Sequence, residues 1–441
     1  MVNRLRNIRL HPKSWMFDQL TKQVGDFLEQ LPDHRRSNVS YKLSDSLKGA
    51  YAMFSLKSPS LLAFRQNFEL PSRRHNLQSV YDLADIPGDT AMRQAIDGVA
   101  PQQLYPLFSQ LIEVLRQEQV WESRQVLGSY TAISVDGTGY YCSSKKQCPH
   151  CLVKKSRNGE EQYYHQLLGA VQMHPESKNV FPVGGEAIVR QQQGGKNDCE
   201  YTAAKRLISR VIEQFKQDKL LFVLDALYVK GPMIELIKSA QASYVIVLKQ
   251  SYVQVQAERL AEQGQLESYS WSDGKTKSTA RFKNSLILNG QYQHIRPNYV
   301  EFEQIEIKSG KTLYKGSWIT DIPLRKDNIT EVIAVGRSRW KIENETFNTL
   351  KNQGYHLEHN YGHGQQYLAT NFALLTLIAF LVDQIAQALD AAFNKAWKAC
   401  GSKRNLWEKV RQVFDLLPAL SMSAIYRFIT NKPMLDVPPL E

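Results

Sequence analysis

The stretch Lys219-Leu220-Leu221-Phe222-Val223-Leu224-Asp225 decides the fold. Its unbroken apolar run is typical of a strand that is buried on both faces of a sheet. A second stretch, Thr131-Ala132-Ile133-Ser134-Val135-Asp136, also predicts a short strand, which Gly137-Thr138-Gly139 would end. Each strand therefore ends in one aspartate, and this repeated design is the main functional signal in the chain.

Helices and strands alternate around these two stretches. The spacing of apolar residues predicts strands at 166–173, 180–183 and 244–248, a long amphipathic helix from Asn197 or Asp198 to Phe215, and a short helix at 233–239. Such alternation implies an α/β core.

The flanking segments are organised around this core. The sequence predicts a pair of helices at 89–98 and 101–115. We favour the interpretation that these two helices pack on each other over the interpretation that they bind in a DNA groove. Residues 250–322 alternate polar with β-branched or aromatic residues, which indicates an antiparallel β insertion, and 372–391 indicates a buried core helix. The pairs Arg35-Arg36 and Arg73-Arg74 could contact DNA phosphates or simply solvate loops. The predicted units are a helical N-terminal region assigned to DNA binding (1–126), the first part of the core with a candidate zinc knuckle at 142–165 (127–249), the β-rich insertion (250–322), the C-terminal helices of the core (323–400) and a C-terminal helical tail (401–441).

The composition narrows the class of protein. The chain has 441 residues, 43% of them hydrophobic and 22% charged, which excludes collagen-like and wholly disordered proteins. The opening residues 1–9 contain no apolar run of a secretory signal, and the apolar stretch 372–382 is shorter than the roughly 20 residues of a membrane span. We expect a cytoplasmic protein without a membrane partner. The net charge of +12 fits either a nucleic-acid partner or simply a soluble basic protein.

Asp136 and Asp225 predict a metal site if a third carboxylate joins them. A carboxylate at the rim of a buried sheet is costly unless a partner or cation neutralises it. Arg339 and Glu343 lie four apart, hence on one helical face, so the guanidinium can orient the carboxylate, and Lys351 further along can contact DNA backbone. Three such carboxylates would hold Mg²⁺ ions for attack on a phosphodiester. Each residue taken alone also has a simpler explanation. Asp136 and Asp225 could be turn-forming aspartates, and Arg339 and Glu343 could form a surface ion pair.

These residues carry a resemblance to a known family. The matching segments are the strands at 133–138 and 223–228 and the Arg-Trp-x-Ile-Glu element at 339–343, followed by Phe347 and Leu350-Lys351. On these segments the chain resembles the DDE transposases of bacterial insertion elements, in particular the insertion sequence four family, over residues 129–380. The resemblance implies an RNase H-like mixed-sheet catalytic core with a β-rich insertion between the second aspartate and the glutamate.

The resemblance also implies a site and a reaction. It implies that Asp136, Asp225 and Glu343 hold Mg²⁺ or Mn²⁺ while Arg339 and Lys351 position phosphate. A homodimer would nick DNA at terminal inverted repeats, and each freed 3′ hydroxyl would then attack target DNA. Some members of the family pass through a DNA hairpin stabilised by a stacked tryptophan, for which Trp318 and Trp271 are candidates.

Two positions depart from the family signature. Gly336 stands where a tyrosine is usual, and Leu350 stands where a lysine is usual, with Lys351 one residue later. Glu345 therefore rivals Glu343 as the third metal ligand, and the spacing from Arg339 favours Glu343. Two other functions remain open: a nuclease with the same core that cannot join strands, and a DNA-binding protein, decayed or domesticated, without catalysis.

A second group of residues predicts a structural zinc site. Cys142, Cys148, Cys151 and His165 provide thiolates and an imidazole, with a C-x-x-C spacing at 148–151. His150, His165 and Cys199 compete as the fourth ligand, and free surface thiols are the alternative. The neighbouring cations favour contact with DNA phosphates; they are Lys145, Lys146, Lys154, Lys155 and Arg157.

Two further sets of residues are assigned simpler roles. His356, His359 and His363 have a spacing seen in metal sites, but their glycine-punctuated loop favours hydrogen bonds or phosphate contact. Asp198 and Glu200 are interpreted as charges at a helix N-terminus.

Overall fold

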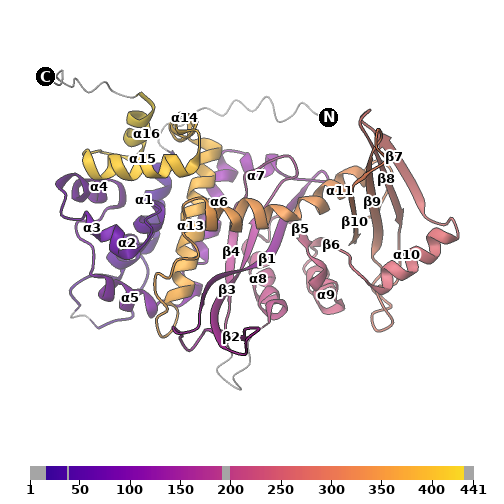
Figure 1. Ribbon diagram of the computed structural model, residues 1–441, viewed down its shortest axis with the longest axis horizontal. Coiled ribbons are helices and arrows are strands. Elements are labelled where there is room, and N and C mark those ends of the chain that lie inside the picture. Colours follow the sequence, from indigo (N-terminus) through magenta and orange to yellow (C-terminus); the bar gives the residue numbers. More distant parts are fainter. Residues whose placement is uncertain (1–15, 37–38, 191–198, 432–441) are drawn as a thin grey trace.

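The computed structural model describes residues 16–36, 39–190 and 199–431. A helical lobe, a central sheet covered by helices and a β-rich insertion lie side by side along the long axis (Figure 1). The helices are α1 (Met16–Glu29), α2 (Leu43–Ser55), α3 (Leu61–Gln66), α4 (Pro71–Tyr81), α5 (Asp89–Asp97), η1 (Pro101–Gln103), α6 (Pro106–Gln117), α7 (Val120–Ser123), α8 (Glu200–Gln214), η2 (Ala226–Tyr228), α9 (Gly231–Ser239), α10 (Tyr252–Glu262), α11 (Ile329–Arg337), η3 (Ser338–Trp340), η4 (Ile342–Phe347), α12 (Asn348–Asn352), α13 (Leu368–Leu389), α14 (Ala391–Cys400), α15 (Lys403–Leu416) and α16 (Met422–Asn431). The strands are β1 (Tyr130–Ser143), β2 (Leu152–Lys155), β3 (Glu161–Gln172), β4 (Phe181–Ile188), β5 (Lys219–Leu224), β6 (Ser243–Val247), β7 (Glu267–Ser272), β8 (Thr276–Lys283), β9 (Asn298–Glu306) and β10 (Thr312–Thr320).

Five strands form an RNase H-like core in the order β4-β3-β1-β5-β6. The pairs β4–β3 and β3–β1 are antiparallel, whereas β1–β5 and β5–β6 are parallel. Helix α8 connects β4 to β5 and α9 connects β5 to β6, as parallel strands require a crossover. The apolar residues of β5 are buried, which confirms the strand predicted at 219–224 and the α/β class.

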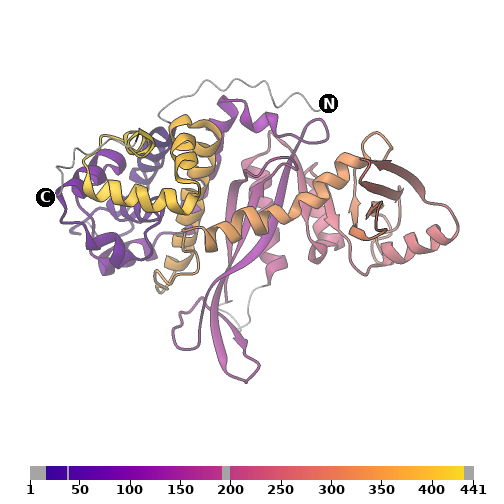
Figure 2. The same ribbon diagram turned by 45° about the horizontal axis from the view of Figure 1, so that its top comes forward.

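Strand β1 is longer than predicted. The sequence predicted that Gly137-Thr138-Gly139 would end it after Asp136, but β1 continues to Ser143, paired with β3 along its length and irregular between Gly139 and Tyr141. The prediction was wrong because β3 supplies hydrogen-bond partners beyond the point where β5 ends. Together β1, β2 and β3 form a ribbon that projects from the core (Figure 2).

The insertion contains the predicted antiparallel sheet, but it begins with a helix. Ser251 caps α10 by accepting a hydrogen bond from the backbone N–H of Gln254. The strands β7 to β10 then pair in sequence, and β10 also pairs with β6 of the core. One continuous sheet therefore joins the insertion to the core.

The helical lobe is built from both ends of the chain. Asp390 at the start of α14 accepts a hydrogen bond from the backbone N–H of Phe17 at 3.1 Å, and Asp18 accepts hydrogen bonds from the first backbone N–H groups of α16. The predicted units at 1–126 and 401–441 thus both contribute to one body, made of α1 to α5 and α14 to α16, which Figure 1 shows at the left. Helix α7 instead lies against the core, where Trp121 stacks on Phe215.

Helix α13 is the core helix predicted at 372–391. It is long and apolar enough to cross a membrane, but 89% of its most apolar window is buried inside the protein. It packs against α1 and α2 of the lobe and against β4 of the sheet, so it joins the two parts.

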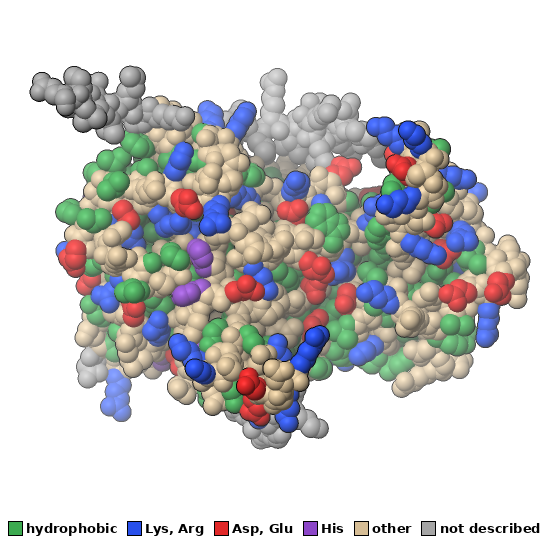
Figure 3. Space-filling view, viewed as in Figure 1, with side chains coloured by type: hydrophobic (Ala, Val, Ile, Leu, Met, Phe, Trp, Pro, Cys, Tyr) green, Lys and Arg blue, Asp and Glu red, His purple; other side chains and the backbone are tan. Residues whose placement is uncertain are grey.

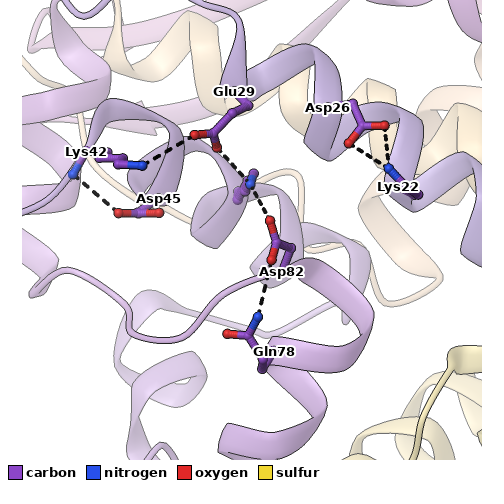
Figure 4. Close-up of polar contacts among 8 residues, drawn as sticks. Lys22, Asp26, Glu29, Lys42, Asp45, Gln78 and Asp82 are labelled. Carbon is purple, nitrogen blue, oxygen red and sulfur yellow. Dashed lines mark hydrogen bonds and ion pairs between the residues drawn. The ribbon is translucent and has the colours of Figure 1, made fainter.

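A polar network links α1, α2 and α4 at the surface of the lobe (Figure 4). The ammonium group of Lys48 lies 2.9 Å from both Glu29 and Asp82. Lys22 and Asp26 form a separate, exposed pair at 2.8 Å on α1.

Candidate active site

Asp136 and Asp225 lie on adjacent parallel strands. The last registered pair of β1 and β5 is Ser134 with Val223, so each aspartate comes two residues later. Both aspartates therefore lie just beyond the point where the parallel pairing of β1 with β5 ends, which places the two residues side by side, although β1 itself continues to Ser143. Asp225 also forms a turn, since its Oδ1 accepts a hydrogen bond from the backbone N–H of Leu227 at 2.9 Å.

The helical segment that carries Glu343 is seated on the sheet beside Asp136. Gly169 of β3 is the residue paired with Asp136, and a side-chain carbon at Gly169 would come within 3.0 Å of the Phe347 ring. Phe347 is buried at this position. Because Glu343 lies about one turn before Phe347 in the π-helical segment η4, it projects from the same side of the run toward Asp136.

Arg339 joins the two carboxylates. Its Nη1 donates to Oδ2 of Asp136 at 2.8 Å and its Nη2 donates to Oε1 of Glu343 at 2.6 Å. The predicted placement of Arg339 and Glu343 on one helical face is therefore confirmed, although this part of the run is 3₁₀ and π rather than α. The run from Ile329 to Asn352 crosses the sheet from the insertion to the helical lobe (Figure 2).

Burial and charge oppose each other at Asp136. Burial raises its pKa to about 6, Glu343 adds to this rise, and the backbone N–H of Gly137 and the charge of Arg339 limit it. Glu343 is more exposed, and although desolvation opposes the change, the hydrogen bond from Arg339 lowers its pKa. The carboxylates of Asp136 and Glu343 therefore lie close together, with the guanidinium of Arg339 as their shared cationic partner.

The two other predicted residues interact with other charged groups. The charge of Glu345 raises the pKa of Lys341 and of Lys403, which burial lowers. Lys351 forms an ion pair with Glu358 at 3.1 Å. Arg339 thus brings the carboxylate of Glu343 to Asp136.

A fourth carboxylate lies next to this cluster. Glu200, the first residue of α8, approaches Gly137 so closely that a side-chain carbon there would come within 3.0 Å of its Oε2. The hydroxyl of Tyr228 donates to its Oε1 at 3.0 Å. Burial raises the pKa of Glu200, and Asp225 adds to the rise. The predicted role as a helix N-terminal charge is correct but incomplete, and Asp198 lies outside the described residues.

The position of Trp318 explains why residue 336 is a glycine and not the tyrosine that is usual in the family signature. A side-chain carbon at Gly336 would come within 2.7 Å of Nε1 of Trp318, so a tyrosine does not fit. Trp318 is 1% exposed and Trp271 is stacked between Tyr269 and Phe302, which leaves neither free to stack on a base.

A cleft of about 1190 Å³ opens between the core and the insertion. Asp225 and Arg339 lie at one wall, with Lys249, Lys315 and Arg337 also in the lining. Trp340 lines the same cleft and is 44% exposed. Lysine and arginine side chains gather over the outer strands of the insertion, at the upper right of Figure 3; the exposed lysines of these strands and their turns include Lys275, Lys277, Lys308 and Lys311. The cleft thus combines acidic groups with surrounding positive charge.

The cysteine and histidine group differs from the predicted one. Cys148, Cys151, His165 and His363 place their ligand atoms within 4.8 Å of one another. Cys142 is exposed, and its sulfur contacts the side chain of Gln162 instead. The other candidates also lie apart from the group: the ring of His150 stacks on Tyr367, and the sulfur of Cys199 contacts Thr202.

Gly169→Ala is expected to destabilise the protein by about 1–3 kcal/mol because the new methyl group meets the Phe347 ring. Urea denaturation measures the change. Gly184→Ala on the adjacent strand is the control, since its methyl group would lie 3.5 Å from Leu207 in ordinary contact. Equal stability of the two variants would show that Phe347 does not depend on the glycine.

The site can be compared with known proteins. Residues 128–381 match the family described as Transposase DDE domain. No curated protein matches the chain. Among solved structures, the chain is similar to one titled "Cryo-EM structure of piggyBac transposase synaptic complex with hairpin DNA", with 10% identity and a TM-score of 0.40 over 97% of this chain and 86% of that chain.

Proposed function

The chain belongs to the DDE transposase family, and from this premise we propose that it cleaves DNA at the terminal inverted repeats of a mobile element and joins the freed ends to target DNA. A homodimer would hold the two ends. The observation that carries the proposal is that Arg339 bridges Asp136 and Glu343, while Asp225 follows the neighbouring parallel strand and lines a cleft together with Arg339.

The three carboxylates fit a divalent cation such as Mg²⁺ or Mn²⁺. They offer the hard oxygen ligands that these ions prefer, and Asp136 and Glu343 are close enough to alter each other's pKa. A cation relieves this repulsion, as Arg339 does in part. When bound, it would polarise the phosphate and activate a water or hydroxyl nucleophile.

The surrounding residues would bind and orient the DNA. Arg339 holds two of the carboxylates in place and offers a planar cation to a phosphate. Lys249, Lys315 and Arg337 in the cleft supply positive charge for the backbone. The exposed ring of Trp340 is a better stacking surface for a base than Trp318 or Trp271.

A duplex carrying one end of the element, labelled and incubated with Mg²⁺ or Mn²⁺ and a target plasmid, tests the proposal. We expect a nick at the repeat boundary, followed by a joined product in the plasmid. Cleavage without joining would indicate a nuclease, and tight binding without cleavage would indicate a DNA-binding protein; either result would refute the proposed reaction.

Glu343→Gln and Glu345→Gln form a matched pair in this assay. Because Arg339 holds Glu343, and not Glu345, through a hydrogen bond beside Asp136, we expect loss of cleavage only in Glu343→Gln. The reverse result would assign the third carboxylate to Glu345.

A further inference from the structure

We propose that Cys148, Cys151, His165 and His363 bind one structural zinc ion that fastens the β1–β3 ribbon to the loop between α12 and α13. The four side chains come from two parts of the chain that lie about two hundred residues apart, since His363 is 212 residues beyond Cys151. The proposal does not depend on the transposase reaction.

The distances match a tetrahedral zinc site. The two sulfurs lie 3.4 Å apart, and Nε2 of His165 lies 3.4 Å from each. Nδ1 of His363 lies 3.5 Å from the Cys151 sulfur and 3.2 Å from Nε2 of His165. Zinc bonds of about 2.3 Å to sulfur and about 2.0–2.1 Å to nitrogen give tetrahedral edges of roughly 3.3–3.8 Å. The five edges given above are within about 0.4 Å of those values, and the sixth, between the Cys148 sulfur and Nδ1 of His363, is at most 4.8 Å.

Hydrogen bonds alone do not satisfy this group. Nε2 of His165 contacts three ligand atoms at once, whereas one ring nitrogen has a single proton or a single lone pair to offer. Cys151 and His165 are buried, so water does not supply the missing partners. A cation at the centre would satisfy all four atoms together.

The backbone around the two cysteines supports a metal. The N–H of Cys151 donates to the carbonyl of Cys148 at 3.1 Å, which forms the tight turn of a C-x-x-C knuckle. The N–H of Cys148 donates to the Cys151 sulfur at 3.3 Å, a contact that stabilises a metal-bound thiolate.

The site would connect three parts of the molecule. The loop that carries His363 is already held by the helical lobe, where Arg93 donates to the carbonyl of Tyr361 at 2.9 Å and the carboxylate of Asp97 accepts hydrogen bonds from the backbone N–H groups of residues 365–368. The same loop follows the helical run that bears Glu343. Zinc would therefore brace the ribbon against the lobe and against the segment after the acidic cluster.

The site is tested by measuring the zinc content of the purified protein with elemental mass spectrometry. We expect one zinc ion per chain in the wild type and none in His363→Ala or Cys148→Ser. Cys142→Ser and His150→Ala are matched controls from the same ribbon, and both should retain the ion. Full zinc in His363→Ala would overturn the assigned ligand set.

Cobalt substitution keeps the test valid where a variant fails to fold. Wild-type protein exchanged with Co²⁺ should show the thiolate charge-transfer band and the intense visible bands of a tetrahedral ion. Chelation of the wild type should lower the melting temperature, and zinc should restore it. A wild type that binds neither metal, or that carries a disulfide between Cys148 and Cys151, would refute the proposal.

Discussion

Asp225→Ala is expected to lower DNA cleavage by about three orders of magnitude or more, because in the proposed function the variant loses one of the carboxylates that would hold the metal ion. Asp225 lies at the rim of the buried strand β5 and lines the cleft, so its removal leaves the core packing intact. DNA binding should persist, since the cations around the cleft remain. Gel-based cleavage and a binding assay on the same duplex separate the two effects.

Asp327→Ala provides the control for this loss. Asp327 is an exposed aspartate that pairs with Arg325 just before α11, at 3.0 Å, and its replacement should leave cleavage unchanged. If Asp225→Ala cleaved DNA as fast as the wild type, Asp225 would have only the structural role of capping its turn, and the proposed metal-binding role would be wrong.

The second large effect concerns a buried ion pair between the lobe and the core helix. Lys57 and Asp383 are 1% and 2% exposed, with their charged atoms 2.6 Å apart. The Tyr355 hydroxyl donates to Asp383 at 2.6 Å, and the Lys57 ammonium lies 3.9 Å from the centroid of the Trp407 ring. Burial lowers the pKa of Lys57 and raises that of Asp383. Asp383→Leu should destabilise the protein by about 3–5 kcal/mol because it leaves Lys57 as an uncompensated charge.

A double variant separates the pair from the packing around it. Lys57→Met combined with Asp383→Leu should be more stable than Asp383→Leu alone, since no charge is left unpaired. Asp26→Ala, which breaks the exposed pair with Lys22 shown in Figure 4, should change the unfolding free energy by less than about 1 kcal/mol. Additive losses in the double variant would show that the two charges do not interact.

The local pattern of apolar and charged residues was sufficient to predict the core strands and part of the candidate active site. The apolar run of β5 and the Asp225 that follows it were recognisable because burial on both faces leaves no polar residue between Leu220 and Leu224. The spacing of Arg339 and Glu343 predicted their contact because residues four apart share a helical face.

Contacts between distant segments were not predictable from the same patterns. The length of β1 depends on its pairing with β3, and the helical lobe depends on the return of the C-terminal helices to α1. His363 joins the cysteines only through the fold. The sequence contained a C-x-x-C motif without a clear fourth ligand and a histidine spacing that we assigned to hydrogen bonds or phosphate contact, and nothing in it linked the two. Glu200 reaches the aspartates because Gly137 has no side chain, which composition does not reveal.

The most direct test of the central claim is anomalous diffraction from crystals of the protein bound to an element-end duplex and soaked in Mn²⁺. The account predicts manganese peaks coordinated by Asp136, Asp225 and Glu343. Peaks bound by Glu345 in place of Glu343, or no peak at these carboxylates, would contradict it.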